Sequence, residues 1–259
     1  MATAAQLQDW KRSRSVAFDR ATGRAFFAVS ALLFAGSAAL TAVWSLSMAA
    51  MGGMPMPGGW TMSMAWMRMP GQTWLGAASS FVGMWVVMMV AMMLPSLIPI
   101  LWRYREAISG TGEARVGWLT ALVGLGYFFV WTLVGIAVFP GGVALAGVEM
   151  QHSSLSRAVP IAGGVVVLIA GALQPTSWKA HHLASCREVP GGSQPLAENA
   201  RTAWRHGLRL GLHCVYGCAG LTAILLVLGV MDLRAMAVVT AAITLKRCLL
   251  YTSPSPRDS

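Results

Sequence analysis

The feature that most constrains this chain is a series of apolar runs without a charged side chain, several of them longer than about 18 residues. As an α-helix, a run of that length crosses the roughly 30 Å hydrocarbon core of a lipid bilayer. Only 11% of the residues are charged, whereas soluble domains contain about 25%. The pattern predicts an all-α, polytopic membrane helix bundle and argues against a soluble globular enzyme.

About six transmembrane helices are expected, forming one transmembrane domain over residues 25–247. At a rise of about 1.5 Å per residue, each complete run lies near the bilayer thickness, and the fourth is the shortest. A basic segment, residues 1–24, precedes the domain. The expected spans cover residues 25–46, 74–102, 116–139, 158–173 and 208–230, and a truncated sixth begins near Ala235.

Basic residues are unevenly divided between the two sides of these spans. The formal net charge is +10, but Lys and Arg punctuate the apolar runs, so we expect a lipid bilayer as partner and no nucleic acid. Thirteen Lys and Arg residues lie on the side of the N-terminus, against only Arg68, Arg157 and Arg234 on the other. This asymmetry predicts a multi-pass protein of the bacterial inner membrane with a cytoplasmic N-terminus.

The last twelve residues, 248–259, resemble the in-frame translation of a sequencing adaptor. Two prolines and an Arg-Asp pair interrupt the apolar run that precedes them. We therefore expect the native sequence to stop near Arg247, so Cys248 is left out of the candidate ligands.

Methionine is concentrated in one part of the chain. Thirteen of the 17 methionines lie between Met48 and Met93, eight of them in the expected outer loop, residues 48–73. Thioether sulfur is a soft, neutral ligand that suits Cu(I). The spacing of Met51, Met54 and Met56, with Gly and Pro between them, predicts a flexible loop that wraps sulfurs around one copper ion. The alternative is an interfacial segment in which methionine only fills space.

The methionine-rich region continues into the second expected span. Met84, Met88 and Met92 recur every four residues and therefore form one stripe along a helix. Packing explains such a stripe as well as metal binding does. Pro95 and Pro99 each remove a backbone donor, which predicts a kink beside the stripe.

Two pairs of metal-ligand residues share the same helical spacing. His182 and Cys186 are four residues apart, as are Cys214 and Cys218, so each pair lies on one helix face. The expected topology places both pairs at similar depth near the cytoplasmic side. Together they predict a four-coordinate site of one imidazole and three thiolates for Cu(I) or zinc. The alternative for the cysteines is a purely apolar role in the core.

Several motifs resemble those of the bacterial predicted metal-binding integral membrane proteins, a family defined as a domain of unknown function. The similar segments are residues 85–96, 126–131, 174–190 and 207–233, and the joint resemblance covers about residues 74–245. It implies metal binding but no reaction. Three departures from the family pattern are His182 in place of a cysteine, the run 216–219 in place of Gly-Cys-Cys-Trp, and the pair 246–247 in place of Glu-Lys.

These observations favour a membrane protein that handles or delivers Cu(I), with no turnover chemistry assigned. A copper-dependent membrane oxidase or a copper chaperone is the expected partner. One alternative is a structural or assembly subunit of a membrane complex. The other is a membrane thiol oxidoreductase that uses Cys186, Cys214 and Cys218, which their expected location on the reducing side of the membrane disfavours.

Overall fold

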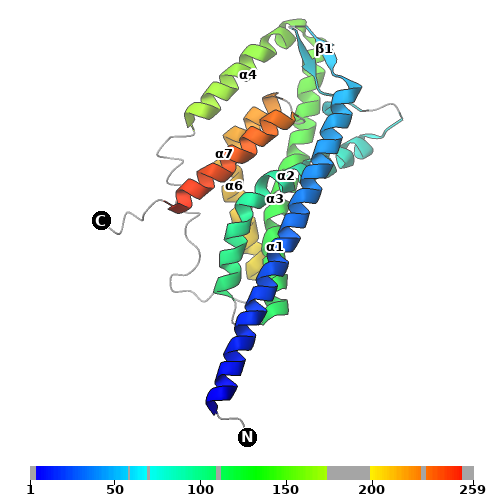
Figure 1. Ribbon diagram of the computed structural model, residues 1–259. Coiled ribbons are helices and arrows are strands. Elements are labelled where there is room, and N and C mark those ends of the chain that lie inside the picture. The colour runs from blue at the N-terminus through cyan, green and yellow to red at the C-terminus, as the bar shows by residue number, and fades with distance from the viewer. Residues whose placement is uncertain are drawn as a thin grey trace.

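The computed structural model describes residues 4–57, 59–68, 71–108, 112–173, 199–228 and 232–252. This part of the chain is helical apart from one short hairpin and one 3₁₀ turn, which confirms the predicted all-α class (Figure 1). The helices are α1 (Ala4–Met51), α2 (Trp74–Ala107), α3 (Glu113–Gln151), α4 (Ser153–Leu173), α6 (Ala200–Leu228) and α7 (Leu233–Thr252).

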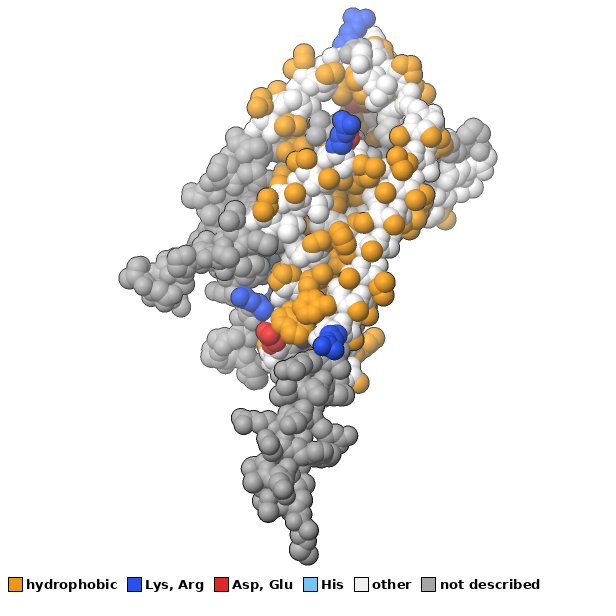
Figure 2. Space-filling model, viewed as in Figure 1, with side chains coloured by type: hydrophobic (Ala, Val, Ile, Leu, Met, Phe, Trp, Pro, Cys, Tyr) orange, Lys and Arg blue, Asp and Glu red, His pale blue; other side chains and the backbone are white. Residues whose placement is uncertain are grey.

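Four helical segments are long and apolar enough to cross a membrane. They are Thr22–Met51, Trp74–Ala107, Ala114–Gln151 and Ala200–Leu226. The helices that correspond to the expected fourth and sixth spans have shorter apolar segments, Ser153–Ile169 and Leu233–Leu245. Figure 2 shows hydrophobic side chains distributed over the described face, and many large apolar side chains of α1, α3 and α4 are exposed.

Most helices extend beyond the spans expected from the sequence, α2 and α3 among them. α3 runs on to Gln151, well past the expected end at residue 139, and Pro140 lies inside it. α2 stays helical through Pro95 and Pro99, and Figure 1 shows its two ends running in different directions. Its N-terminus is capped by Thr73, whose hydroxyl oxygen accepts a hydrogen bond of 3.1 Å from the Gly76 amide.

The methionine-rich segment after α1 contains a two-stranded antiparallel hairpin, β1 (Met54–Met56) and β2 (Trp60–Met62). Met56 and Met62 are buried beneath it against Ala146 of α3. The Trp60 indole N–H donates to the Ser156 carbonyl of α4 at 2.9 Å, and the Ser156 hydroxyl donates to the Pro57 carbonyl at 3.0 Å. These contacts attach the hairpin to the ends of α3 and α4.

The core lies where α2 meets α3, α6 and α7. Trp85 of α2 is fully buried, and its indole N–H donates to the Trp131 carbonyl of α3 at 2.9 Å. Buried methionines at positions 88, 89, 92 and 93 belong to the same packed cluster, together with Cys214 and Cys218 of α6.

Close backbone contact joins α3 and α6, which run parallel. A Cβ added at Gly211 would lie 2.9 Å from the Tyr127 carbonyl oxygen, and one added at Gly207 would overlap the Val123 carbonyl. The two helices therefore need glycine at these positions to approach each other. Their approach determines which side chains of α3 and α6 meet in the core.

Candidate metal site

Cys214 and Cys218 lie one turn apart on the face of α6 that is turned into the core. Their exposed fractions are 2% and 7%. The two Sγ atoms are 3.8 Å apart, far beyond the roughly 2.05 Å of a disulfide bond. The structure therefore holds two separate, buried thiols that share one face, as their four-residue spacing predicted.

Two side chains from other helices reach the Cys214 sulfur. The Tyr127 hydroxyl of α3 donates a hydrogen bond of 2.9 Å to the Cys214 Sγ, and Met93 of α2 places its Sδ 3.9 Å from the same atom. Tyr127 and Met93 are both fully buried. Three helices thus bring together two thiols, one thioether and one phenolic hydroxyl, and we call Cys214, Cys218 and Met93 the thiol site.

Met93 and Tyr127 were not among the predicted site residues. The expected stripe consisted of Met84, Met88 and Met92, but the thioether beside Cys214 belongs to the next residue along the chain. Met88 and Met92 are buried in the same core cluster, and Met84 packs against it. The signals that could have pointed to the missed residues are the paired methionines at positions 92–93 and the tyrosine in the motif at 126–131.

His182 and Cys186, the other predicted pair, lie outside the described residues. The structure therefore bears on only half of the expected four-ligand cluster. Within the described ranges, no three His, Cys, Asp or Glu side chains form a group that could hold a metal ion. The nearby histidines of α6 make other contacts: His206 stacks on Tyr104, and the His213 Nδ1 lies 2.7 Å from the Arg209 carbonyl oxygen.

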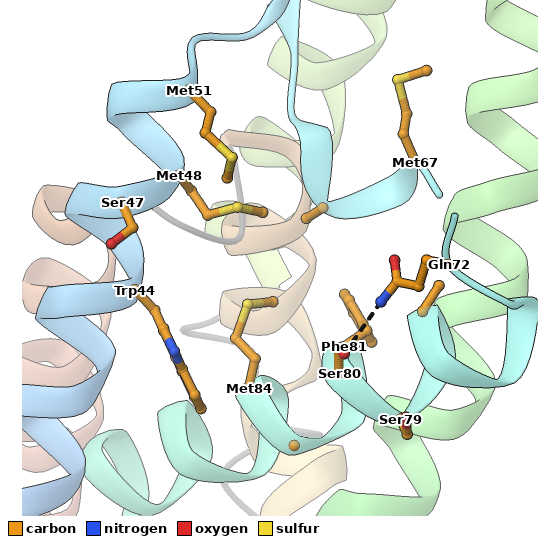
Figure 3. Close-up of a pocket in the computed structure, with 13 residues that line it drawn as sticks. Trp44, Ser47, Met48, Met51, Met67, Gln72, Ser79, Ser80, Phe81 and Met84 are labelled. Carbon is orange, nitrogen blue, oxygen red and sulfur yellow. Dashed lines mark hydrogen bonds between the residues drawn. The ribbon is translucent and has the colours of Figure 1, made fainter. Parts of the chain in front are cut away.

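A second group of sulfurs lines a cavity of about 520 Å³ between the end of α1 and the start of α2, which we call the methionine cavity. In Figure 3, the side chains of Met48 and Met51 on α1 and of Met84 on α2 extend into the same space, whereas Met67 points away from them. Met51 is 52% exposed, so the cavity opens to the surface.

The three predicted loop ligands are separated in the structure. Met51 lies at the end of α1 and lines the methionine cavity, whereas Met54 and Met56 belong to β1. Met56 is buried under the hairpin, and Met54 packs beside it. The hairpin thus uses Met54 and Met56 for packing in this conformation, and the cavity gains Met48 instead.

The described residues thus form a helical bundle with four helices of membrane-spanning length and a buried group of sulfur ligands. A family model described as PpoB2, a copper chaperone, matches residues 82–254, which is two thirds of the chain. The chain therefore belongs to the PpoB2 copper chaperone family, which indicates a copper-related role. This is consistent with the metal-binding family that the sequence motifs indicated.

The match to residue 254 continues beyond Arg247 into the segment that resembles an adaptor, and it lends that interpretation no support. A search of curated proteins and a search of solved structures found no match to the chain.

Proposed function

We propose that this chain is an integral membrane copper chaperone that holds Cu(I) at the thiol site. The observation that carries the proposal is the pair of sulfur–sulfur distances around Cys214, 3.8 Å to Cys218 and 3.9 Å to Met93. Two ligands bound at about 2.3 Å to one ion, with an angle of about 120° between them, lie about 4 Å apart. The sulfurs are therefore already spaced as ligands of a single ion would be.

The chemistry of these donors fits Cu(I) better than zinc. Thiolate and thioether sulfur are soft ligands that select Cu(I), and structural zinc sites take four ligands with no thioether among them. The described part of the site supplies two thiols and one thioether. His182 and Cys186 remain candidate further ligands in this proposal, because both residue types bind either metal.

The Tyr127 hydroxyl supports the site without being a ligand. Cys214 binds metal as a thiolate, and an O–H donor at 2.9 Å stabilises the negative charge that forms on its sulfur. The surrounding core is apolar, so few other groups can stabilise that charge. Tyr127 is thus a positioning residue that prepares Cys214 for Cu(I).

We further propose that the protein resides in the bacterial inner membrane with its N-terminus in the cytoplasm, and that it exchanges Cu(I) with a copper-dependent membrane oxidase or another copper chaperone. The distribution of Lys and Arg supports the orientation. Four apolar helices of sufficient length support the membrane location. The role assigned is binding and delivery, with no reaction turned over by the chain.

Metal content and affinity of the full chain test this proposal. The detergent-solubilised protein is kept reduced, loaded with Cu(I) in competition with a Cu(I) chelator, and compared with the double variant C214S/C218S and with M93L. We expect a tight Cu(I) equivalent that C214S/C218S abolishes and M93L weakens. The matched control is M236L, because Met236 is also buried, at 5% exposed, but lies on α7 outside the thiol site.

The other results each identify a different function. Zinc retained in preference to Cu(I), and lost in H182A/C186A, would replace the proposed site by a four-ligand zinc site. A disulfide between Cys214 and Cys218 that forms and is reduced during turnover of a thiol substrate would establish an oxidoreductase. A chain that binds neither metal would be a structural or assembly subunit.

A further inference from the structure

The methionine cavity is a second group of sulfur ligands that the thiol site does not use. We propose that Met48, Met51 and Met84 form a separate Cu(I) site, open to the surface, from which copper loads the buried thiol site. This inference rests on the proposed function, since it assigns the place where the same cargo is first taken up.

The three side chains line the same space, from two helices. Met48 and Met51 are three residues apart in the last turns of α1, so they project from one face, and Met84 faces them from α2 (Figure 3). Trp44 and Phe81 form apolar walls beside them. The space of about 520 Å³ accommodates an ion together with the movement of flexible thioethers.

The lining of the cavity favours a soft monovalent ion. The described residues that line it include no Asp, Glu, Lys or Arg; its polar members are three serines and Gln72, whose amide contacts the Ser80 hydroxyl at 3.4 Å. Hard divalent cations require charged oxygen ligands, which this lining lacks. Neutral thioethers bind Cu(I) and do not titrate, so a site of this kind binds over a wide pH range.

A row of buried methionines connects the cavity with the thiol site. Met84 lines the cavity and packs against the core cluster that contains Met93 and both cysteines. The methionines at positions 88, 89 and 92 lie between them on α2 and are at most 3% exposed. Nine residues of helix span about 14 Å, so sulfur recurs at every turn along this distance. Soft sulfur ligands therefore continue along α2 from one site to the other.

The difference between thioether and thiolate gives the transfer its direction. Each step breaks one bond between Cu(I) and a thioether and forms one to the next sulfur, and the ion keeps its oxidation state. At the end of the row, each cysteine that binds releases its proton to water. Because thiolates carry charge and thioethers do not, Cu(I) is held more tightly at Cys214 and Cys218 than in the methionine cavity.

The equilibrium test is Cu(I) titration of the full reduced chain in detergent against chelators of graded affinity. We expect one tight equivalent and one equivalent at least tenfold weaker. The triple variant M48L/M51L/M84L should lose the weak equivalent and keep the tight one, and C214S/C218S should do the reverse. The matched control is M67L. Met67 lines the same cavity but points away from the other three methionines, so this variant should keep both equivalents. A weak equivalent that persists in the triple variant would overturn the proposal.

The kinetic test follows the ultraviolet absorption of Cu(I)–thiolate bonds after rapid mixing with chelated Cu(I). Replacing the methionines at 88, 89 and 92 by leucine preserves side-chain volume, so both equivalents should remain. We expect the thiolate signal to form at least tenfold more slowly than in the wild type, and M236L to leave the rate unchanged. A wild-type rate in M88L/M89L/M92L would refute loading along the row. If the wild-type chain binds no tight equivalent, the proposed function is refuted. If it binds the tight equivalent but no weak one, only this inference is refuted.

Discussion

Replacing Tyr127 with phenylalanine tests the proposed chemistry of the thiol site with the least disturbance to packing. The change removes one hydroxyl, which donates to the Cys214 Sγ at 2.9 Å. The aromatic ring stays, together with its edge contact to Phe128 at a centroid distance of 5.2 Å. Because no side-chain carbon is lost, any effect on copper binding comes from the loss of the hydroxyl.

The magnitude follows from the change in charge on the sulfur. Without metal, the bond joins two neutral groups and contributes about 1 kcal/mol, whereas a bond to a charged acceptor contributes about 1.5–3 kcal/mol. Copper binding converts the Cys214 thiol to a thiolate, so the bond strengthens by about 0.5–2 kcal/mol. That difference corresponds to an expected rise of about twofold to thirtyfold in the Kd for Cu(I) at the thiol site.

The assay is chelator competition of the reduced full chain, with Tyr216→Phe as the matched control. Tyr216 lies on the same helix two residues beyond Cys214, but it is 73% exposed. We expect its variant to bind Cu(I) like the wild type and both variants to keep the same stoichiometry. Wild-type affinity in Y127F would refute the reasoning, because it would mean that the hydroxyl does not stabilise the bound thiolate.

Three further predictions concern packing and pH. Gly211→Ala places a Cβ 2.9 Å from the Tyr127 carbonyl oxygen, so overpacking should lower the free energy of unfolding by about 1–3 kcal/mol. The variant should therefore melt at a lower Tm and bind Cu(I) more weakly at the thiol site. Gly124→Ala, which meets nothing within 4 Å, should leave both unchanged in the same melting and competition experiments. Lowering the pH should weaken the tight Cu(I) equivalent, because protons compete for thiolates, and leave the weak thioether equivalent constant; parallel titrations at several pH values measure this. Met62→Ala leaves a cavity at a position that is 2% exposed under the hairpin, so thermal melts should show a loss of about 2–5 kcal/mol in the free energy of unfolding. The copper stoichiometry at the thiol site should stay the same.

Local sequence pattern was sufficient for the helices and for one pair of buried thiols. The length of the uncharged runs predicted the helical class, because a segment that crosses a bilayer must pair its own backbone N–H and C=O groups, and a helix does so within one segment. The four-residue spacing of Cys214 and Cys218 predicted that both thiols share one face, and the structure shows their sulfurs 3.8 Å apart. Both inferences depend only on helical periodicity, which acts within a single segment.

Boundaries and the hairpin were less accessible to this reasoning. Pro140 stands inside α3 although proline usually ends a helix, and the helix continues to Gln151. The loop methionines showed no strand pattern, yet residues 54–62 form a hairpin held by hydrogen bonds to α4. At the hairpin, hydrogen bonds to α4 outweigh local preference, and such contacts cannot be read from one segment.

The sequence by itself determined that this is an apolar helical chain, rich in soft sulfur, with two thiols on one face of a helix. Only the tertiary structure decided which other groups meet those thiols. Close contact at Gly207 and Gly211 sets the position of α6 along α3, and this position brings Tyr127 to Cys214. Met93 reaches the same sulfur from α2. Periodicity specifies the face of a helix, whereas the partner across that face depends on how backbones pack, and packing involves residues far apart in the chain.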